Sequence, residues 1–151
     1  MAPLTLRYGM EIRGATPLDA PGLVTLLNEA GTIVEERAVA DRLAAVRQTG
    51  TALIATQWGP PSGLVVVHWY PTLADDRPTA QITTLLVARE ERRRGIGRLL
   101  LKAASQAARA AGCGTLELLA AKEDISMHEF CRATGFAQAG LRHVRSLHRQ
   151  R

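Results

Sequence analysis

Aromatic residues are scarce in this chain, which holds two each of Phe, Trp and Tyr among 151 residues. Basic residues outnumber acidic ones by 19 to 14, so the net charge is +5. A basic surface attracts nucleic acid, but a single-strand binder also needs aromatic side chains between its cations to stack on the bases. The arginines cluster here without such aromatics, so nucleic-acid binding is only a minor alternative.

Cysteine is equally rare, and long apolar runs are missing. The spacing of Cys113 and Cys131 suits neither a zinc site nor a disulfide scaffold, so we expect no metal and a reducing compartment. No apolar run approaches the roughly twenty residues that span a bilayer. Residues 1–13 also lack the pattern of a signal peptide. We therefore expect a cytoplasmic protein without membrane contact.

The most informative feature that is present is the run Arg92-Arg93-Arg94-Gly95-Ile96-Gly97, between an apolar segment and a helical pattern. A strand, a glycine-rich turn and a helix point several N–H groups and a positive helix end at one spot, which predicts a phosphate site. Arg98 and Leu99 exclude a P-loop, which needs lysine and a hydroxyl there. Leu100 stands where the dinucleotide fingerprint needs its third glycine.

These residues resemble motif A of the GCN5-related N-acetyltransferases (GNAT), Arg/Gln-x-x-Gly-x-Gly/Ala, with Arg92, Gly95 and Gly97 in its fixed places. Upstream, residues 82–87 resemble the fourth strand of the family, which ends about five residues before this arginine. Downstream, residues 130–136 (FCRATGF) resemble the family's Phe-Tyr-x-x-x-Gly-Phe segment, and residues 11–20 resemble its opening strand and helix start. The resemblance covers nearly the whole chain.

The periodicity of apolar residues and the positions of glycine and proline support a mixed α/β order of helices and strands. We expect one domain over residues 1–151, with residues 1–9 as a flexible N-terminal extension. The family fold implies a twisted mixed sheet of about six to seven strands flanked by about four helices. Its fourth and fifth strands, here 80–87 and 115–120, splay apart. We expect the other strands at 10–15, 51–56 and 63–70, helices from residue 16 or 19 and at 35–47, 98–111 and 126–134, and a last hairpin from Phe136.

The resemblance implies acetyl-CoA as the acyl donor, with its pyrophosphate on the loop amides and its pantetheine pairing with the fourth strand. An N–H there, of Val87 or Leu86, stabilises the oxyanion. The acceptor enters beside the first helices, His68, Trp69, Tyr70 and the loop after them. The expected donor-binding residues are Leu85, Leu86, Val87, Arg92, Arg93, Arg94, Gly95, Ile96, Gly97 and Arg98.

The acid and base residues usual in the family are replaced in this chain. Cys131 aligns with the tyrosine that protonates the leaving thiolate, and a thiol with an ordinary pKa near 8.5 can donate a proton. A small buried residue on an amphipathic helix is the alternative reading of Cys131. The usual strand carboxylate aligns with Thr83 or Thr84. His68 and Glu117 are the candidate bases, and His128 lies near the expected thioester.

The resemblance therefore predicts an acetyl-CoA-dependent N-acetyltransferase that acts on a primary amine of a small molecule by direct attack in a ternary complex. Positioning the reactants supplies on the order of 7 kcal/mol or more of the barrier, so weak acid and base groups do not exclude catalysis. A non-catalytic acyl-CoA-binding regulatory module is the alternative, and a protein N-terminal or lysine acetyltransferase is another. We expect a homodimer through a strand edge at residues 141–147.

Overall fold

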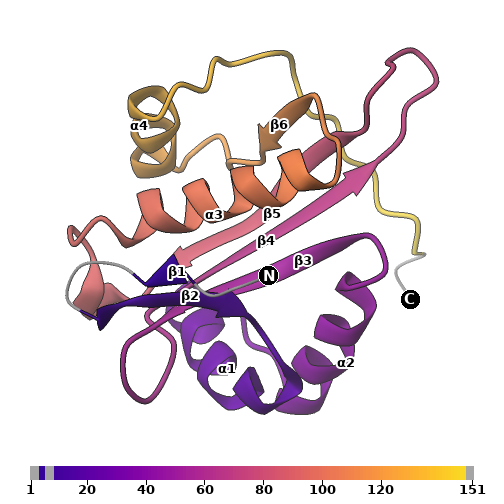
Figure 1. The fold of residues 1–151 in the computed structure, drawn as a ribbon. Helices are drawn as coiled ribbons and strands as arrows, with labels where there is room; N and C mark the ends of the chain where they lie inside the picture. Colours follow the sequence, from indigo (N-terminus) through magenta and orange to yellow (C-terminus); the bar gives the residue numbers. More distant parts are fainter. Residues whose placement is uncertain (1–3, 6–8, 149–151) are drawn as a thin grey trace. The chain divides into compact units, whose positions relative to one another are not determined.

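The computed structural model describes residues 4–5 and 9–148, and the chain divides into two compact units, residues 1–119 and 120–151. The first unit holds a six-stranded sheet in the order β1 to β6 and three α-helices (Figure 1). The strands are β1 (Leu4–Thr5), β2 (Glu11–Gly14), β3 (Gly50–Thr56), β4 (Gly63–Tyr70), β5 (Thr79–Val87) and β6 (Thr115–Leu118). The helices are α1 (Ala20–Glu29), α2 (Glu36–Val46) and α3 (Ile96–Ala110), with single 3-10 turns at Pro17–Asp19 and Arg89–Glu91.

The sheet is mixed, as the sequence predicted. Strands β1 to β5 pair antiparallel with their neighbours, whereas β6 pairs parallel to β5. A parallel pair needs a crossover connection, and α3 provides it between β5 and β6. The end of β5 therefore leads directly into the loop before α3, which is where the sequence predicts a phosphate site.

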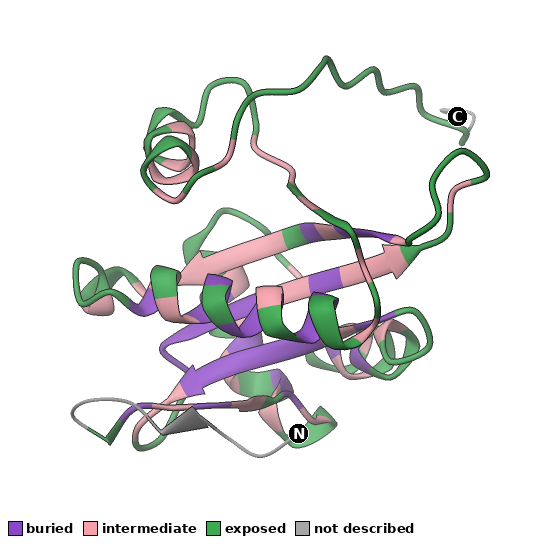
Figure 2. Ribbon diagram, turned by 45° about the horizontal axis from the view of Figure 1, so that its top comes forward, coloured by how far each residue is buried: buried purple, intermediate pink, exposed green. Residues whose placement is uncertain are grey.

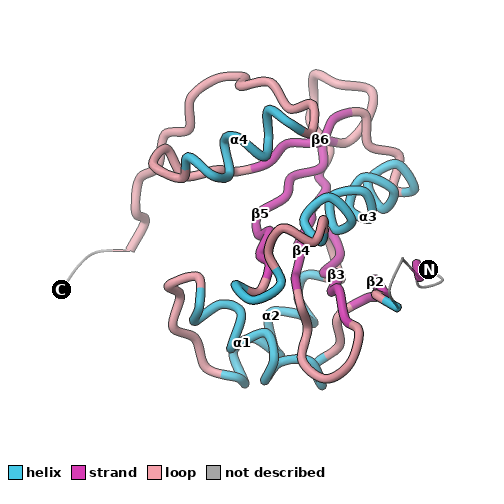
Figure 3. The backbone as a smooth tube through the Cα atoms, turned by 90° about the vertical axis from the view of Figure 1, so that its left-hand side faces the viewer, coloured by secondary structure: helices cyan, strands magenta, loops and turns pink. Residues whose placement is uncertain are grey.

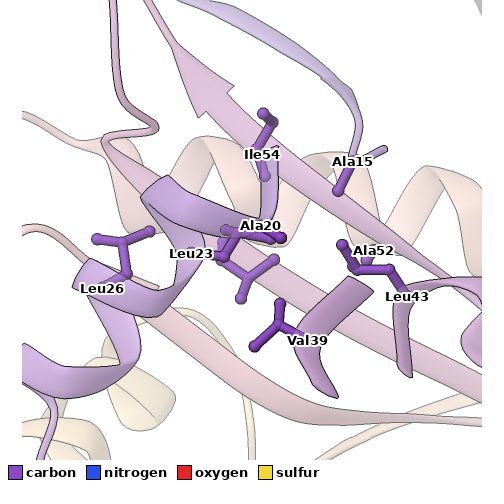
Figure 4. Close-up of a cluster of buried hydrophobic side chains, with 9 residues drawn as sticks. Ala15, Ala20, Leu23, Leu26, Val39, Leu43, Ala52 and Ile54 are labelled. Atoms are coloured by element: carbon purple, nitrogen blue, oxygen red, sulfur yellow. The ribbon is translucent and has the colours of Figure 1, made fainter. Parts of the chain in front are cut away.

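Helices cover both faces of the sheet, with α1 and α2 on one face and α3 on the other (Figures 1 and 3). This arrangement explains why β3 and β4 are apolar on both faces, and Figure 2 shows their residues mostly buried. The core under α1 and α2 (Figure 4) consists of Ala15, Ala20, Leu23, Leu26, Val39, Leu43, Ala52, Ile54 and Leu64.

The first turn of α3 packs unusually close to the sheet because β4 begins with a glycine. A Cβ atom on Gly63 would lie 2.8 Å from Leu100 Cδ1 and 3.1 Å from Ile96 Cγ2. Leu100 is fully buried, and the small residues Ala103, Ala104 and Ala107 continue its stripe at helical spacing. The N-terminus of α3 is thus held in a fixed place against β4.

The second unit contains α4 (Ile125–Ala133). Its N-cap residue is Asp124, whose carboxylate accepts a hydrogen bond of 3.0 Å from the Met127 N–H. The prediction of a last hairpin from Phe136 is wrong, because residues 136–148 form no strand. Apolar residues recur there at every third position, Leu141, Val144 and Leu147, and all three are exposed. A strand buries alternate residues, so this spacing gives no apolar strand face. The strand edge expected at residues 141–147 is absent with it.

Two further differences concern the bounds of elements, whereas the number of strands agrees with the expectation. The α3 helix begins at Ile96, two residues earlier than expected, so Gly97 lies in its first turn. Of the expected N-terminal extension, Leu4 and Thr5 pair with β2, Gly9 is described, and residues 1–3 and 6–8 lie outside the described residues. The sheet has six strands, the lower of the two expected numbers.

Candidate active site

The loop before α3 leads into a helix start whose backbone N–H groups have no acceptor within the helix. Gly95 has a φ of 78°, and the first intrahelical bond runs from the Leu99 N–H to the Gly95 carbonyl oxygen. The N–H groups of the first turn, those of Ile96, Gly97 and Arg98, therefore lack an acceptor within the helix. No acidic residue lies in this turn, so the positive end of the helix is not offset there.

Exposed arginines flank the helix start in the sequence. Arg92, Arg93 and Arg98 are solvent-exposed, and so is Arg94, which pairs with Glu91. Arg93 itself adopts a positive φ of 69°, a conformation rare for a residue with a side chain. The loop thus holds a strained shape that combines free N–H donors with cationic side chains. That combination fits a pyrophosphate.

A gap between β5 and β6 begins next to this loop. The parallel pairing covers Thr79 to Ile82 of β5 and ends with Leu118, after which the Leu119 N–H donates to the Ile82 carbonyl oxygen at 3.1 Å. Strand β5 continues to Val87 along β4 alone. The expected splay of these two strands is therefore confirmed, and it leaves one edge of β5 open over residues 83–87.

A β-bulge decides which main-chain groups face this gap. Val67 pairs with Ile82 but Val66 pairs with Thr84, so Thr83 is the extra residue. The Ala88 N–H donates to the Ser62 carbonyl oxygen on the β4 side at 2.8 Å. By strand alternation Thr84 and Leu86 also turn their main-chain groups to β4, whereas Leu85 and Val87 turn theirs into the gap. Leu86, expected in the gap, is thus engaged with β4 instead.

A row of polar side chains lies at the closed end of this gap. The register aligns His68, Gln81 and Glu117 across three strands. Tyr70 Oη and Gln81 Nε2 both donate to Glu117 Oε1, at 3.4 and 3.2 Å, and His68 Nε2 lies 3.0 Å from Thr83 Oγ1. Leu64 belongs to the core under α1 and α2, Val66 packs against that core, and both alternate with His68, so this row lies on the sheet face that those helices cover.

The structure thus places His68, Tyr70 and Glu117 on one face of the sheet and Trp69 on the other. Trp69 pairs with Ala80 and, by alternation, points to the α3 face. Burial and the nearby Glu117 carboxylate raise the pKa of Tyr70, which keeps its hydroxyl protonated as the donor. Sequence reasoning missed Gln81, although it is the single amide side chain in an apolar strand.

Cys131 and His128 lie on α4, in the second unit. Burial, together with the Asp124 carboxylate, raises the pKa of the Cys131 thiol. The thiol therefore stays protonated at neutral pH. His128 Nε2 lies 3.2 Å from the Lys122 carbonyl oxygen in the same unit.

The part of the chain that the structure describes contains neither a group of metal ligands nor a membrane-spanning helix. Among residues 4–5 and 9–148, no three His, Cys, Asp or Glu side chains gather as metal ligands. No helix in these ranges has the length and apolar character needed to cross a membrane.

Comparison with known proteins gives a consistent result. The family model described as "Acetyltransferase (GNAT) family" matches residues 22–136. A solved structure described as "Putative acetyltransferase from Agrobacterium tumefaciens str. C58" is similar at 29% identity, with a TM-score of 0.78 over 89% of this chain and 99% of its own. No curated protein matches the chain.

Two more distant structures share the fold. One is an aminoglycoside acetyltransferase, meta-AAC0020, from an uncultured soil metagenomic sample, in complex with sisomicin (21% identity, TM-score 0.77, 93% of this chain and 97% of that one). The other is a ribosomal-protein-alanine N-acetyltransferase from Brucella melitensis biovar Abortus 2308 (18% identity, TM-score 0.78, 92% and 99%). The fold, the loop before α3, the splayed strands and the family match agree, and the chain belongs to the GNAT acetyltransferase family.

Proposed function

We propose that the protein transfers the acetyl group of acetyl-CoA to a primary amine of a small molecule, by direct attack in a ternary complex. One observation carries the proposal: an open strand edge is connected by a short loop to a helix start whose N–H groups have no acceptor within the helix. The open edge of β5 ends at Val87, and the loop that contains the 3-10 turn Arg89–Glu91 connects it to the N–H groups of Ile96, Gly97 and Arg98.

The chain's own groups fit such a donor. The three free N–H groups of α3 and the exposed arginines would hold its phosphates. The N–H and C=O groups of Leu85 and Val87 offer the hydrogen bonds of an unpaired strand edge to its amide-containing arm. When bound, acetyl-CoA supplies an activated acyl group.

The remaining groups would position the acceptor and manage protons. The N–H of Val87 or Leu85 faces the gap and could stabilise an oxyanion there, whereas that of Leu86 faces β4. Cys131, kept protonated by its raised pKa, is our candidate proton donor to the leaving thiolate. His68 and Glu117 are the candidate bases on the acceptor side.

Glu117 supports an amine as the acceptor. Its carboxylate accepts two hydrogen bonds from neutral donors on the same oxygen, and no ion pair involves it among the described residues. An exposed carboxylate without a cationic partner can attract an ammonium group as it approaches. The similar structures carry both kinds of acceptor in their names, an aminoglycoside and a ribosomal protein, so a protein amine is the second candidate.

The test combines binding and turnover. Isothermal titration with acetyl-CoA is followed by a free-thiol release assay against a panel of small amines, peptides with free N-termini and lysine peptides. We expect saturable binding and thiol release that depends on a small amine. Release only with peptides would replace the small-molecule acceptor, and binding without release on any panel member would favour the non-catalytic acyl-CoA-binding module.

The same assay on Cys131→Ala separates the two readings of this cysteine. A proton donor predicts a kcat lowered by about a hundredfold, in the range usual for acid and base groups. A spacer predicts unchanged kcat with a lower thermal stability. Cys113→Ala is the matched control, because Cys113 is also half-buried but follows the C-terminus of α3, at the helix end opposite the proposed phosphate site.

A further inference from the structure

His68 and Thr83 form a side-chain contact between β4 and β5 at the bulge. His68 Nε2 and Thr83 Oγ1 lie 3.0 Å apart, within the range of a good hydrogen bond. Thr83 is solvent-exposed, although it lies on an inner strand of the sheet, whereas His68 beside it is half-buried. The side chain that contacts the imidazole is thus the more solvent-exposed of the two.

The bulge explains why this hydroxyl is there. Thr83 is the extra residue of β5, so it has no partner residue of its own on β4, and it shares a sheet face with Gln81 and His68. Regular pairing would have placed residues 83 and 84 on opposite faces. The bulge therefore adds one side chain, that of Thr83, to the sheet face that carries Gln81 and His68.

Thr83 also marks the closed end of the gap. The open edge of β5 begins immediately after Ile82, the last residue paired with β6, and runs to Val87, where the loop to α3 begins. At about 3.3 Å per residue, Val87 and Thr83 are about 13 Å apart. A donor anchored by its phosphates at α3 and extended along this edge has its far, reactive end at Thr83, because β6 blocks the edge beyond it.

We propose that Thr83 is a catalytic residue whose hydroxyl takes the proton of the acceptor amine and passes its own proton to His68 Nε2. As the N–C bond of the product forms, the amine proton moves to Thr83 Oγ1 and the Thr83 proton moves to His68. The C–S bond breaks, its electron pair leaves on sulfur, and that sulfur takes up one proton that comes ultimately from solvent. His68 returns its proton to solvent, so all atoms and charges balance.

This relay rests on the proposed acetyl transfer, but it makes one claim that needs no substrate. For Thr83 to donate, the neutral His68 ring must carry its hydrogen on Nδ1 and accept at Nε2. Nitrogen-15 NMR of the imidazole distinguishes the two tautomers. We expect the Nδ1–H tautomer in the wild type and loss of that preference in Thr83→Val. A wild-type ring protonated on Nε2 would overturn the relay.

Kinetics give the second test. We expect Thr83→Val to lower kcat by about a hundredfold at an unchanged KM, and Thr83→Ser, which keeps the hydroxyl, to stay within a few-fold of wild type. The double variant Thr83→Val/His68→Gln should be no slower than either single variant, because members of one relay are not additive. Thr51→Val is the control, since it makes the same chemical change in β3 on the opposite sheet face.

The outcomes are distinguishable from a failure of the proposed function. If the wild type turns over amines and Thr83→Val is equally fast, or if the two changes multiply, the relay is refuted while acetyl transfer stands. If the wild type turns over no amine, the proposed function fails, and the tautomer measurement still decides whether Thr83 donates to His68. A lowered kcat that Thr83→Ser also shows would refute a role for the hydroxyl.

Discussion

The two ends of α3 offer a matched pair of substitutions that separates helix stability from phosphate binding. Gly95 precedes the helix with a φ of +78°, and Gly112 follows it with a φ of +86°. A Cβ atom at either position would meet nothing within 4 Å. Gly95→Ala and Gly112→Ala therefore impose the same backbone strain without a clash, and only the first touches the proposed phosphate site.

The expected loss of stability is the same at both ends. Left-handed backbone costs a residue with a side chain about 1–2 kcal/mol. Replacing glycine also stiffens the unfolded chain, which recovers about 0.4–1 kcal/mol. The net loss is about 1 kcal/mol for each variant, which corresponds to about 2–4 °C in Tm for a chain of this length.

Acetyl-CoA affinity should separate the variants. Gly95 sets the direction of the N–H groups of Ile96 and Gly97, and a hydrogen bond to a charged group contributes about 1.5–3 kcal/mol. Misalignment of one such bond in Gly95→Ala should raise Kd at least about tenfold in isothermal titration. Gly112→Ala should bind like wild type. Equal weakening in both variants, or none in Gly95→Ala, would refute the reasoning.

Three other substitutions test the stability of the first unit, two through packing around α3 and one through the Arg13–Asp19 ion pair. Leu100→Ala should cost about 2–5 kcal/mol in urea unfolding, because Leu100 is fully buried under the sheet. Gly63→Ala should cost about 1–3 kcal/mol and also weaken acetyl-CoA binding, because its Cβ would push Ile96 and the first turn of α3 outward. Hydrogen bonds from Arg13 lower the pKa of Asp19 below its ordinary 3.8. Unfolding free energy should therefore fall as pH drops below about 4, as the carboxylate that the folded state favours becomes protonated, and Asp19→Asn should flatten this fall.

Most of the first unit could be predicted because its signals are local. The glycine loop, the stripe of α3 from Leu100 to Ala107 and the glycine and proline residues between β3 and β4 each specify one element. The predicted bounds differ from the observed ones by one or two residues, as at the start of α3. The prediction of a hairpin at the end of the chain was wrong because Leu141, Val144 and Leu147 recur every three residues, a spacing that does not match a strand.

The arrangement of the site could be predicted only in part. His68 and Glu117 were identified as polar residues among apolar neighbours and Tyr70 through the family resemblance, but their meeting depends on pairing register across three strands. The bulge at Thr83 has no sequence signal of its own. The sequence led us to expect the main-chain groups of Leu85, Leu86 and Val87 in the gap, and the bulge sets the alternation that turns those of Leu86 to β4.

An NMR titration of the amide signals with acetyl-CoA tests the central claim most directly, because it reports on the phosphate loop and the strand edge together. We expect saturable shifts of the Ile96, Gly97 and Arg98 amides, and also of the Leu85 and Val87 amides, with smaller shifts at Leu86, whose N–H is engaged with β4. Saturation with all of these amides unmoved, or no saturable binding, would contradict the account.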